Sequence, residues 1–316
     1  MKKICVTGAK GFIGRSLCEA LNSLDNSVRG FVRTIESDKN FSEIEYVSVG
    51  DISSKMNWKD QLKGCDCIVH CAGIAHNMNN NNDFDFYRLV NTEGTRLLAQ
   101  QAIEAGVKRL VFISSVKVNG ESTGNINSRD IFRSNDIPDP QDAYAISKFE
   151  AEKALWEISN KKDLELVVVR LPLVYGKNVK GNLAHLLKII KSGIPLPLSM
   201  VKNGRSMIGI DNLIDLLIHC IEHPNAVGKT FLASDGEDLS TPYLIKLIGS
   251  SMGIKVRLFP LPIFLLKFLG SIFGKQKEIN RLVGSLRVDN SCAKEILNWK
   301  PKLSVEEGIR RMVQDK

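Results

Sequence analysis

Short apolar runs alternate with amphipathic stretches along the first half of the chain. The runs are typical of buried strands, whereas the stretches between them repeat apolar residues at the spacing of a helix with one buried face. Strands are predicted for residues 2–8, 27–33, 44–51, 65–73, 109–115 and 164–172. Helices are predicted for residues 13–23, 91–106 and 143–160. This alternation predicts right-handed crossovers between parallel strands, and therefore a doubly wound α/β sheet.

The pattern of apolar and polar residues changes after Arg170. Residues 181–193 and 211–223 again predict helices, but prolines and short extended pieces interrupt the pattern around them. We therefore predict a first domain over residues 1–172 and a smaller, mixed α/β lobe over residues 173–316. Some strands and helices of this C-terminal lobe are expected to return to the first domain.

The composition is that of an ordinary globular protein, since 316 residues with 43% hydrophobic and 25% charged side chains can bury a sizeable core. The formal net charge is +8. Because Lys and Arg form no block and no nucleic-acid motif occurs, we expect a basic surface around a small anionic ligand and no nucleic-acid partner. The seven cysteines are odd in number and irregularly spaced, and no signal peptide is visible. These features predict a reducing, cytoplasmic location.

The sequence TGAKGFIG, residues 7–14, follows the first predicted strand and opens the first predicted helix. In this context Gly8 permits a tight turn, Gly11 lets the backbone approach a pyrophosphate, and Gly14 allows close contact between helix and strand. The pyrophosphate would then lie on the N-terminus of the helix, beside Phe12 and Ile13. The motif predicts that the first domain is a Rossmann-type NAD(P)-binding domain.

Two basic residues stand near the expected adenosine end of this site. NAD-binding domains usually place an acidic residue at the end of the second strand, where it binds the ribose 2′-hydroxyl, but here that strand ends at Arg33. A guanidinium suits a 2′-phosphate, and Lys10 in the glycine turn can reach the same group. We therefore expect NADP(H) to be preferred, with NAD(H) possible. Asp51 is expected to accept a hydrogen bond from the adenine amino group, with Ile52 packing beside it.

The segment YAISK places Tyr144 and Lys148 four residues apart, on one helix face. Upstream, FISS ends a strand at Ser114 and Ser115, where side chains reach the carboxyl edge of the sheet. A phenol with an ordinary pKa near ~10 is a poor acid–base group at neutral pH, and a neighbouring ammonium is expected to lower it. Tyr144 could then exchange a proton with a substrate hydroxyl or carbonyl during hydride transfer, while Ser115 orients that oxygen.

Taken together, these motifs resemble the extended short-chain dehydrogenases/reductases, in the branch of nucleotide-sugar epimerases, dehydratases and reductases. The similarity covers nearly the whole chain and includes GDI, HCAGIAH, VNTEGT, FISSVKVNG, RLPLVYG, RSMIGIDNL and LNWKPKLSVEEGI. It implies that Ser115, Tyr144 and Lys148 are catalytic, with Tyr144 and Lys148 also contacting the cofactor.

The resemblance also implies roles for residues outside this trio. Ala72 and Gly73 would line the nicotinamide side of the cofactor, and Asn91 would support the active-site helix next to the cofactor. The arginine of the RSMIGIDNL segment, Arg205, would clamp a nucleotide diphosphate, and Asn182 would touch the substrate. The implied substrate is a UDP-linked hexose or N-acetylhexosamine, and the implied assembly is a homodimer.

Three positions depart from the UDP-galactose 4-epimerases in this group. Those enzymes carry a tyrosine at the position of Asn119, an asparagine at that of Leu173, and normally an acidic residue at that of Arg33. An epimerase oxidises and re-reduces the same carbon and needs a retained cofactor, whereas a reductase consumes one equivalent and suits exchangeable NADPH. The full set of motifs, especially SSVKVNGE and SDGEDLST, most resembles enzymes that reduce UDP-4-keto-6-deoxy-N-acetylhexosamines in surface-polysaccharide biosynthesis. The resemblance therefore implies hydride transfer at carbon 4 by a 4-keto reductase of this type.

Two other functions are compatible with the same residues. The first is a UDP-glucose or UDP-N-acetylglucosamine 4-epimerase with tightly held NAD. The second is a non-catalytic NADP-binding redox sensor, which the intact serine, tyrosine and lysine disfavour.

The remaining features are interpreted structurally. Cys65, Cys67 and Cys71 are expected to be small packing residues and not metal ligands, because alternate strand positions point to opposite faces and no second ligand pair follows. His70 is expected inside a strand, and His76 beside an asparagine-rich loop over residues 77–82. Residues 258–275 are the most apolar stretch, but too short and interrupted to span a bilayer. They predict a packed or dimer-forming helix, with weak peripheral membrane contact as the alternative.

Overall fold

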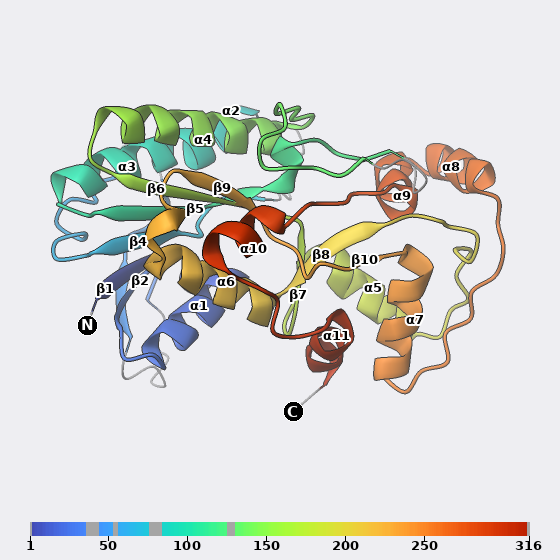
Figure 1. Ribbon diagram of the computed structural model, residues 1–316. Helices are drawn as coiled ribbons and strands as arrows, with labels where there is room; N and C mark the ends of the chain where they lie inside the picture. Colours follow the sequence, from blue (N-terminus) through green and yellow to red (C-terminus); the bar gives the residue numbers. More distant parts are fainter. Residues whose placement is uncertain (1, 36–43, 53–55, 76–83, 125–129, 315–316) are drawn as a thin grey trace.

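Seven parallel strands form the main sheet, in the order β3-β2-β1-β4-β5-β6-β9 (Figure 1). The computed structural model describes residues 2–35, 44–52, 56–75, 84–124 and 130–314, so His76 and the asparagine run lie outside the described residues. The strands are β1 (Lys3–Thr7), β2 (Ser27–Val32), β3 (Glu45–Ser48), β4 (Cys67–His70), β5 (Arg109–Ser115), β6 (Glu165–Leu171) and β9 (Lys229–Leu232). The six strands predicted in the first half are confirmed, and β9 was not predicted.

The order of these strands places the ligand crevice. The chain builds β1, β2 and β3 outward in one direction and then returns to place β4 on the other side of β1. In open parallel sheets ligands bind beyond the carboxyl ends of the strands at such a reversal. The glycine turn after β1 and the loops after β4 and β5 meet at this edge.

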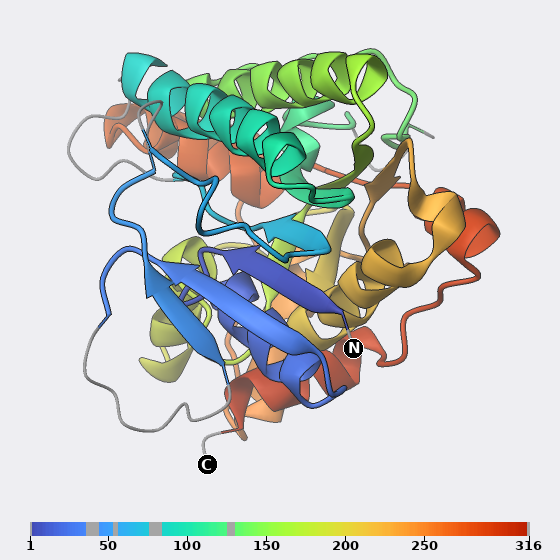
Figure 2. The same cartoon turned by 90° about the vertical axis from the view of Figure 1, so that its left-hand side faces the viewer.

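Helices cover both faces of the main sheet (Figure 2). One face carries α1 (Phe12–Asn22), α6 (Ile210–Glu222) and α10 (Ser291–Leu297), together with the 3₁₀ turn η3 (Pro224–Ala226). The other carries α3 (Gly94–Glu104) and α4 (Ala143–Lys161), preceded by α2 (Phe84–Tyr87) and the π-helical segment η1 (Arg88–Glu93). The 3₁₀ turn η2 (Val116–Val118) follows β5.

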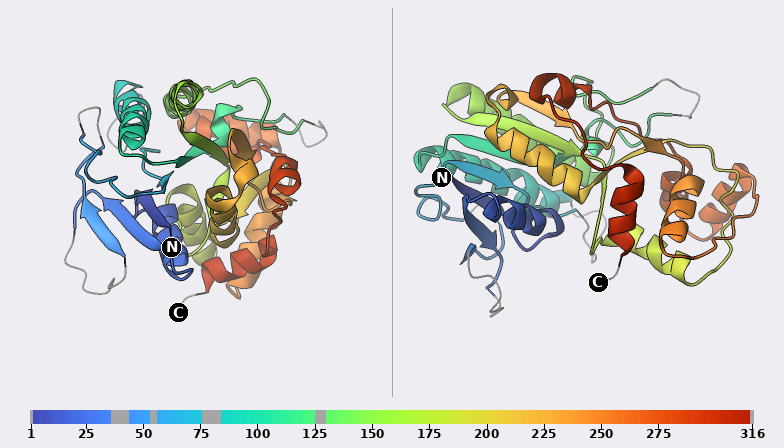
Figure 3. Two further views of the ribbon diagram at one scale, coloured as in Figure 1. Left: turned by 60° about the vertical axis from the view of Figure 1, so that its left-hand side comes forward. Right: turned by 60° about the horizontal axis from the view of Figure 1, so that its bottom comes forward.

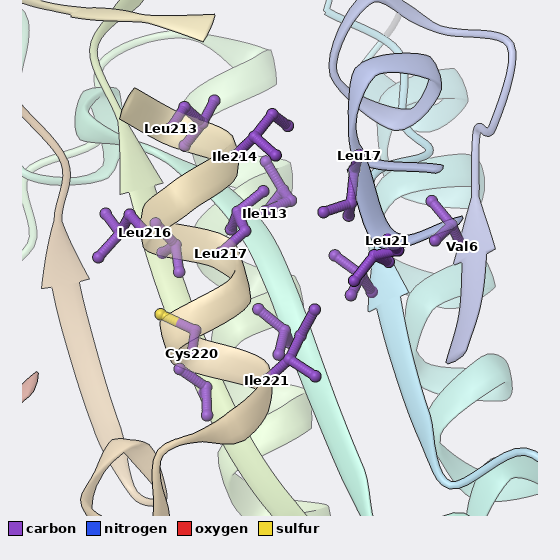
Figure 4. Packing of buried hydrophobic residues seen from close by; sticks show 14 of the residues in the cluster. Val6, Leu17, Leu21, Ile113, Leu213, Ile214, Leu216, Leu217, Cys220 and Ile221 are labelled. Carbon is purple, nitrogen blue, oxygen red and sulfur yellow. The ribbon is translucent and has the colours of Figure 1, made fainter. Parts of the chain in front are cut away.

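The largest apolar core lies between the sheet and the α1–α6 layer. In Figure 4, Leu17 and Leu21 of α1 and Leu217 and Ile221 of α6 project into one apolar layer. All four are 2% exposed or less. Their spacing of four residues on each helix is the periodicity that predicted both helices.

A three-stranded sheet forms the centre of the smaller lobe (Figure 3). Its order is β10-β8-β7, in which β8 (Arg205–Gly209) pairs parallel with β7 (Leu173–Tyr175) and antiparallel with β10 (Asp238–Leu239). Its helices are α5 (Gly181–Lys191), α7 (Thr241–Ser251), α8 (Ile263–Ile272), α9 (Gln276–Val283) and α11 (Val305–Val313). The mixed α/β character predicted for this lobe is confirmed, whereas β9, α6 and α10 come from the second half of the chain and pack with the main sheet.

One cysteine prediction is wrong. Cys5 of β1 and Cys65, just before β4, form a disulfide with Cα atoms 6.2 Å apart, so Cys65 is not a simple packing residue. The physical reason is that β1 and β4 are neighbours in the sheet although their cysteines are 60 residues apart in sequence. Cys67 and Cys71 are free, as expected. Over the described ranges no cluster of three or more metal-ligating side chains occurs, and no helix is long and apolar enough to cross a membrane.

Candidate active site

The glycine turn has the geometry of a pyrophosphate cradle. Gly8 adopts φ +67°, a conformation that favours glycine, and its carbonyl accepts a hydrogen bond from Gly11 N at 2.8 Å. A Cβ on Gly14 would lie 2.2 Å from the Gly8 oxygen, so helix α1 can approach the turn only without a side chain there. Gly11 caps α1 without a side-chain hydrogen bond, which leaves the first-turn N–H groups for an anion. The residues present therefore fit a dinucleotide.

The structure pairs Arg33 with Asp51 at the adenosine end of this crevice. The Arg33 Nε and Asp51 Oδ1 atoms are 2.7 Å apart, and both side chains are largely exposed. Ile52 is half-buried and packs on the core beneath. Lys10 is exposed at the tip of the glycine turn. The sequence assigned Arg33 and Lys10 to a 2′-phosphate. The charge of Arg33, just after β2, is thus partly neutralised by Asp51.

Residues from several elements line one cavity of about 230 Å³ at the carboxyl edge of the sheet. Ser115 ends β5, Tyr144 and Lys148 lie one turn apart on α4, and Ile13 comes from the first turn of α1. Gly73, after β4, completes the wall, and a Cβ there would approach the Asn91 amide oxygen and Lys148 Nζ at 3.1 Å each. The structure therefore brings the predicted serine, tyrosine and lysine together beside the cradle.

Ala72 lies under the cradle. Its backbone N–H donates to Thr7 Oγ1 at 3.1 Å, and a Cβ on Gly8 would lie 3.1 Å from its Cα. Thr7 in turn bonds the ring of His70, the last residue of β4, at 2.7 Å. Burial lowers the pKa of His70 to about 3, so this ring is neutral at physiological pH. His70 is a structural residue inside the strand, as predicted.

The pKa of Tyr144 does not follow the expectation of a lowered value. Burial raises it to about 12, and a hydrogen bond with Ser115 opposes this shift only in part. The Lys148 ammonium is engaged elsewhere: it donates to the carbonyl of Ile113 at 3.0 Å and lies 4.7 Å from the centroid of the Phe112 ring. By itself the chain holds this phenol protonated at neutral pH.

Lys148 is itself strongly perturbed. It is only 6% exposed, and burial lowers its pKa to about 8. A lysine near this value is charged on most molecules at pH 7 and can lose its proton at modest cost. Such a shift in a cavity next to a half-buried tyrosine is typical of a functional site.

Asn91 connects the loop after β4 to the helix that carries Tyr144. Its amide oxygen accepts from Ile74 N at 2.8 Å, and its Nδ2 donates to Ile74 O and to Ser147 Oγ, both at 3.0 Å. Asn91 is 1% exposed and lies in the π-helical segment η1, a distortion often found at functional sites. Asn91 thus joins the loop after β4 to helix α4 through Ser147.

A buried polar network lies behind the cavity, and the sequence analysis did not find it. Arg170 of β6 makes two hydrogen bonds to Glu152 of α4, at 2.7 and 3.0 Å, and both residues are 5% exposed or less. Ser114 donates to the same carboxylate, and Arg170 also donates to Asn119 Oδ1 at 3.0 Å. At the position where the resemblance places a tyrosine in the epimerases, this chain has Asn119, whose side-chain oxygen accepts from Arg170.

Lys117 links the Ser115 loop to the start of α4. Its ammonium pairs with Asp142 and, at 2.9 Å, with Glu121. Asp142 is the N-cap of α4 and accepts from Ala145 N at 2.8 Å. This ion pair therefore helps set the position of Tyr144 relative to Ser115.

Arg205 lies in the smaller lobe at the start of β8. Its Nη1 donates to the carbonyls of Arg281 at 2.7 Å and Gly284 at 3.3 Å, at the end of α9. Burial and the nearby Arg281 cation lower the pKa of Arg205. Two guanidinium groups in one neighbourhood favour an anion, and Arg281 was missed because it lies 76 residues further along the chain. Asn182 is exposed in the first turn of α5.

Residues 4–233 match the profile of the NAD dependent epimerase/dehydratase family. The chain belongs to this family. It is 40% identical over 99% of its length, and over 95% of the relative's, to a protein of Vibrio cholerae named UDP-glucose 4-epimerase. This family includes enzymes that act on nucleotide sugars, in agreement with the resemblance identified from the motifs.

Solved structures of this type share the fold. The UDP-N-acetylglucosamine 4-epimerase of Bacillus cereus superposes with a TM-score of 0.79 at 21% identity, covering 99% of this chain and 98% of that one. The UDP-glucuronic acid 4-epimerase of Bacillus cereus, determined with UDP-glucuronic acid and NAD, superposes with a TM-score of 0.77 at 22% identity, covering 98% and 97%. The family fold predicted from the sequence is therefore confirmed over the whole chain.

Proposed function

We propose that the protein is a UDP-hexose 4-epimerase that retains NAD. The observation that carries the proposal is the cavity shared by Ser115, Tyr144 and Lys148 beside the glycine cradle. Support also comes from the 40% identity with the Vibrio cholerae relative over 99% of the chain. The 4-keto reductase favoured by the sequence becomes the second candidate.

Each residue of the cavity has its own role in the proposed reaction. Bound NAD would supply the hydride acceptor for carbon 4 and the hydride donor for its return. Tyr144 takes the proton of the C4 hydroxyl and gives it back after the sugar has presented its other face, so protons balance over the cycle. Ser115, which hydrogen-bonds Tyr144, also holds the C4 oxygen. Lys148 holds the cofactor ribose and, once turned from Ile113 O toward the cavity, lowers the pKa of the phenol.

Two arginines make a UDP-sugar the fitting substrate class. Arg205 and Arg281 lie close enough for their charges to interact unfavourably. A diphosphate between them would satisfy both guanidinium groups with charge-assisted hydrogen bonds. Asn182, at the start of α5, is proposed to contact the sugar or nucleoside.

The Arg33–Asp51 pair favours NAD as the retained cofactor. Asp51 compensates the charge that would otherwise attract a 2′-phosphate, and its second oxygen can accept from the adenine amino group. The observation that supports the reductase is that β2 is followed by Arg33 and that Lys10 stands in the glycine turn. With both cations turned to a 2′-phosphate, NADPH would be the exchangeable reductant.

The remaining organisation of the protein is proposed on the same grounds. The boundary between the cofactor domain and the substrate lobe is proposed at residue 172, where β6 ends and β7 begins the second sheet. A homodimer and a cytoplasmic location are proposed with the function. The five free cysteines fit a reducing compartment, whereas the Cys5–Cys65 disulfide does not.

A cofactor and turnover assay tests the proposal. The purified protein is denatured to release and identify any dinucleotide, and the native protein is incubated with UDP-glucose or UDP-N-acetylglucosamine without added cofactor. We expect NAD in the extract and a mixture of C4 epimers by proton NMR. Stoichiometric loss of NADPH with a UDP-4-keto-6-deoxy-N-acetylhexosamine, without epimer formation, would establish the reductase instead. Tight dinucleotide binding without any turnover would favour the redox sensor.

A further inference from the structure

Helix α8 carries an exposed apolar stripe. Phe264, Phe268 and Ile272 follow one another at intervals of four residues and are 73%, 59% and 61% exposed. This spacing places them on one helix face. Phe273, just after the helix, is 72% exposed and extends the patch. Contiguous exposed apolar patches of this kind mark interaction sites.

The opposite face of α8 packs against the smaller lobe. Leu266 is 4% exposed in the core of the smaller lobe, and a Cβ on Gly270 would lie 2.7 Å from Ile279 Cγ1 of α9. Close packing on α9 fixes the rotation of α8 and keeps the stripe directed outward. Figures 1 and 3 place α8 at the end of the smaller lobe remote from the main sheet, with α9 beside it.

The chain segment that contains the stripe is strongly basic. Residues 255–283 contain six basic side chains and one acidic one, Glu278, a balance of +5 against +8 for the whole chain. Lys267 is exposed on α8 itself, beside the stripe. Glu278 already pairs with Lys275 at 3.5 Å. The basic residues are Lys255, Arg257, Lys267, Lys275, Lys277 and Arg281.

We propose that the α8 stripe docks on the surface of an anionic lipid bilayer. The phenylalanines enter the interface while the lysines meet lipid phosphates, as in amphipathic membrane-surface helices. Ten residues of helix span only about 15 Å, so α8 lies on a bilayer and does not cross it. A second copy of the chain is the poorer occupant, because face-to-face contact would oppose two surfaces of like charge.

Docking would bring the proposed diphosphate site close to the bilayer. Helix α9 follows α8, and its Arg281 carbonyl accepts from Arg205 Nη1 at 2.7 Å. The proposed diphosphate site is therefore one helix away from the stripe. This consequence rests on the proposed function, whereas the docking itself does not.

Vesicle sedimentation with the full chain tests the docking. We expect binding to vesicles containing phosphatidylglycerol, weak binding to pure phosphatidylcholine, and loss of binding in high salt. Phe264→Ser/Phe268→Ser should weaken binding at least tenfold. The matched control, Leu24→Ser/Ile35→Ser, removes two similarly exposed apolar side chains from the cofactor domain and should bind like the wild type.

Three outcomes would overturn the proposal. One is wild-type protein that does not bind anionic vesicles, and another is binding that survives Phe264→Ser/Phe268→Ser unchanged. The third is a dimer, seen by sedimentation velocity, that the same variant dissociates while vesicles have no effect. Turnover of a water-soluble UDP-sugar should be equal in wild type and variant. Failure of the proposed reaction would therefore be seen separately from failure of docking.

Discussion

The guanidinium of Arg33 and the carboxylate of Asp51 form an ion pair, with 2.7 Å between Nε and Oδ1. Arg33 follows β2 and Asp51 follows β3, and these strands pair in parallel with Val32 opposite Ser48. The carboxyl ends of both strands therefore meet at the adenosine end of the crevice. An arginine that the sequence assigns to a 2′-phosphate thus has a competing partner within the protein.

Removing the carboxylate should shift the cofactor preference toward NADP. In Asp51→Asn the Arg33 charge is uncompensated, and we expect the ratio of NADP to NAD affinity to rise about fivefold, the effect of an exposed ion pair. Fluorescence titration with NADP and with NAD gives the two affinities. A contact of Asp51 with adenine would affect both affinities equally, so it cancels in their ratio. Asp60→Asn, which breaks the exposed pair with Lys63, is the control. An unchanged ratio in Asp51→Asn would exclude this role of the pair.

The hydroxyl of Tyr144 should be essential for turnover and dispensable for cofactor binding. Tyr144→Phe is expected to lower kcat by about 10²–10⁴-fold, the usual contribution of a proton-transfer group, with dinucleotide affinity within about twofold of wild type. Steady-state assays and a binding titration give the two values. Tyr87→Phe is the matched control, because its ring meets Tyr144 edge-on with centroids 6.3 Å apart. Near-normal turnover in Tyr144→Phe would remove the phenol from the mechanism.

Lys148 should make stability depend on pH. Its pKa is about 8 in the folded chain, below the ordinary 10.5. Between these values the unfolded chain binds more protons, so the free energy of unfolding rises with pH, by about 3 kcal/mol over the window. Lys148→Met has no ionisable group at this position, so its free energy of unfolding lacks this dependence on pH. Its stability advantage over wild type in urea unfolding should therefore shrink from pH 7 to pH 10.5, and a difference independent of pH would contradict the burial of the charge.

Arg205 and Arg281 should act together on the diphosphate. Arg205→Ala and Arg281→Ala are each expected to weaken UDP binding by about 10–100-fold, the loss of one charge-assisted contact. Isothermal titration with UDP measures this effect without requiring turnover. Arg257→Ala, an exposed arginine of the same lobe, is the control and should bind UDP normally. Wild-type affinity in both variants would place the nucleotide elsewhere.

The Glu152–Arg170 pair should contribute strongly to stability. Arg170→Met leaves a buried carboxylate whose remaining hydrogen bond comes from Ser114, and we expect a loss of about 3–5 kcal/mol in the free energy of unfolding. Arg170→Met/Glu152→Leu removes both charges and should recover much of that loss. Chemical denaturation of the three proteins gives the comparison. A double variant less stable than Arg170→Met would show that the pair matters beyond its charge.

The hydrophobic pattern predicted the bounds of strands and helices closely wherever a single strand or helix periodicity dominated. The strand predicted at residues 109–115 coincides with β5, and the helix predicted at 143–160 with α4 (Ala143–Lys161). The short strands β7, β8, β9 and β10 were not predicted, because runs of two to five residues carry too little period of their own and form by pairing with neighbouring strands. The π-helical turn at Asn91 likewise depends on packing.

For the candidate site, the spacing of residues along one strand or helix predicted which side chains lie together. The charge of a residue did not predict which partner it pairs with. The glycine turn and the Tyr144–Lys148 spacing are local, since one strand–helix unit and one helix face determine them. The direction of the Lys148 ammonium, the pKa of Tyr144, the Arg33–Asp51 pair and the Cys5–Cys65 disulfide all depend on which strands become neighbours.

The sequence by itself determined the doubly wound sheet, the phosphate cradle and the three residues around the cavity. These features depend on hydrophobic periodicity and on short motifs, both of which act over a few residues. Only the tertiary structure decided the partners of Arg33, Glu152 and Arg205, because pairing between charged groups far apart in sequence is set by the order in which strands assemble. It also decided that Phe264 and Phe268 of α8 face outward. A helix with apolar residues on more than one face does not specify which face is buried until a neighbour covers one of them.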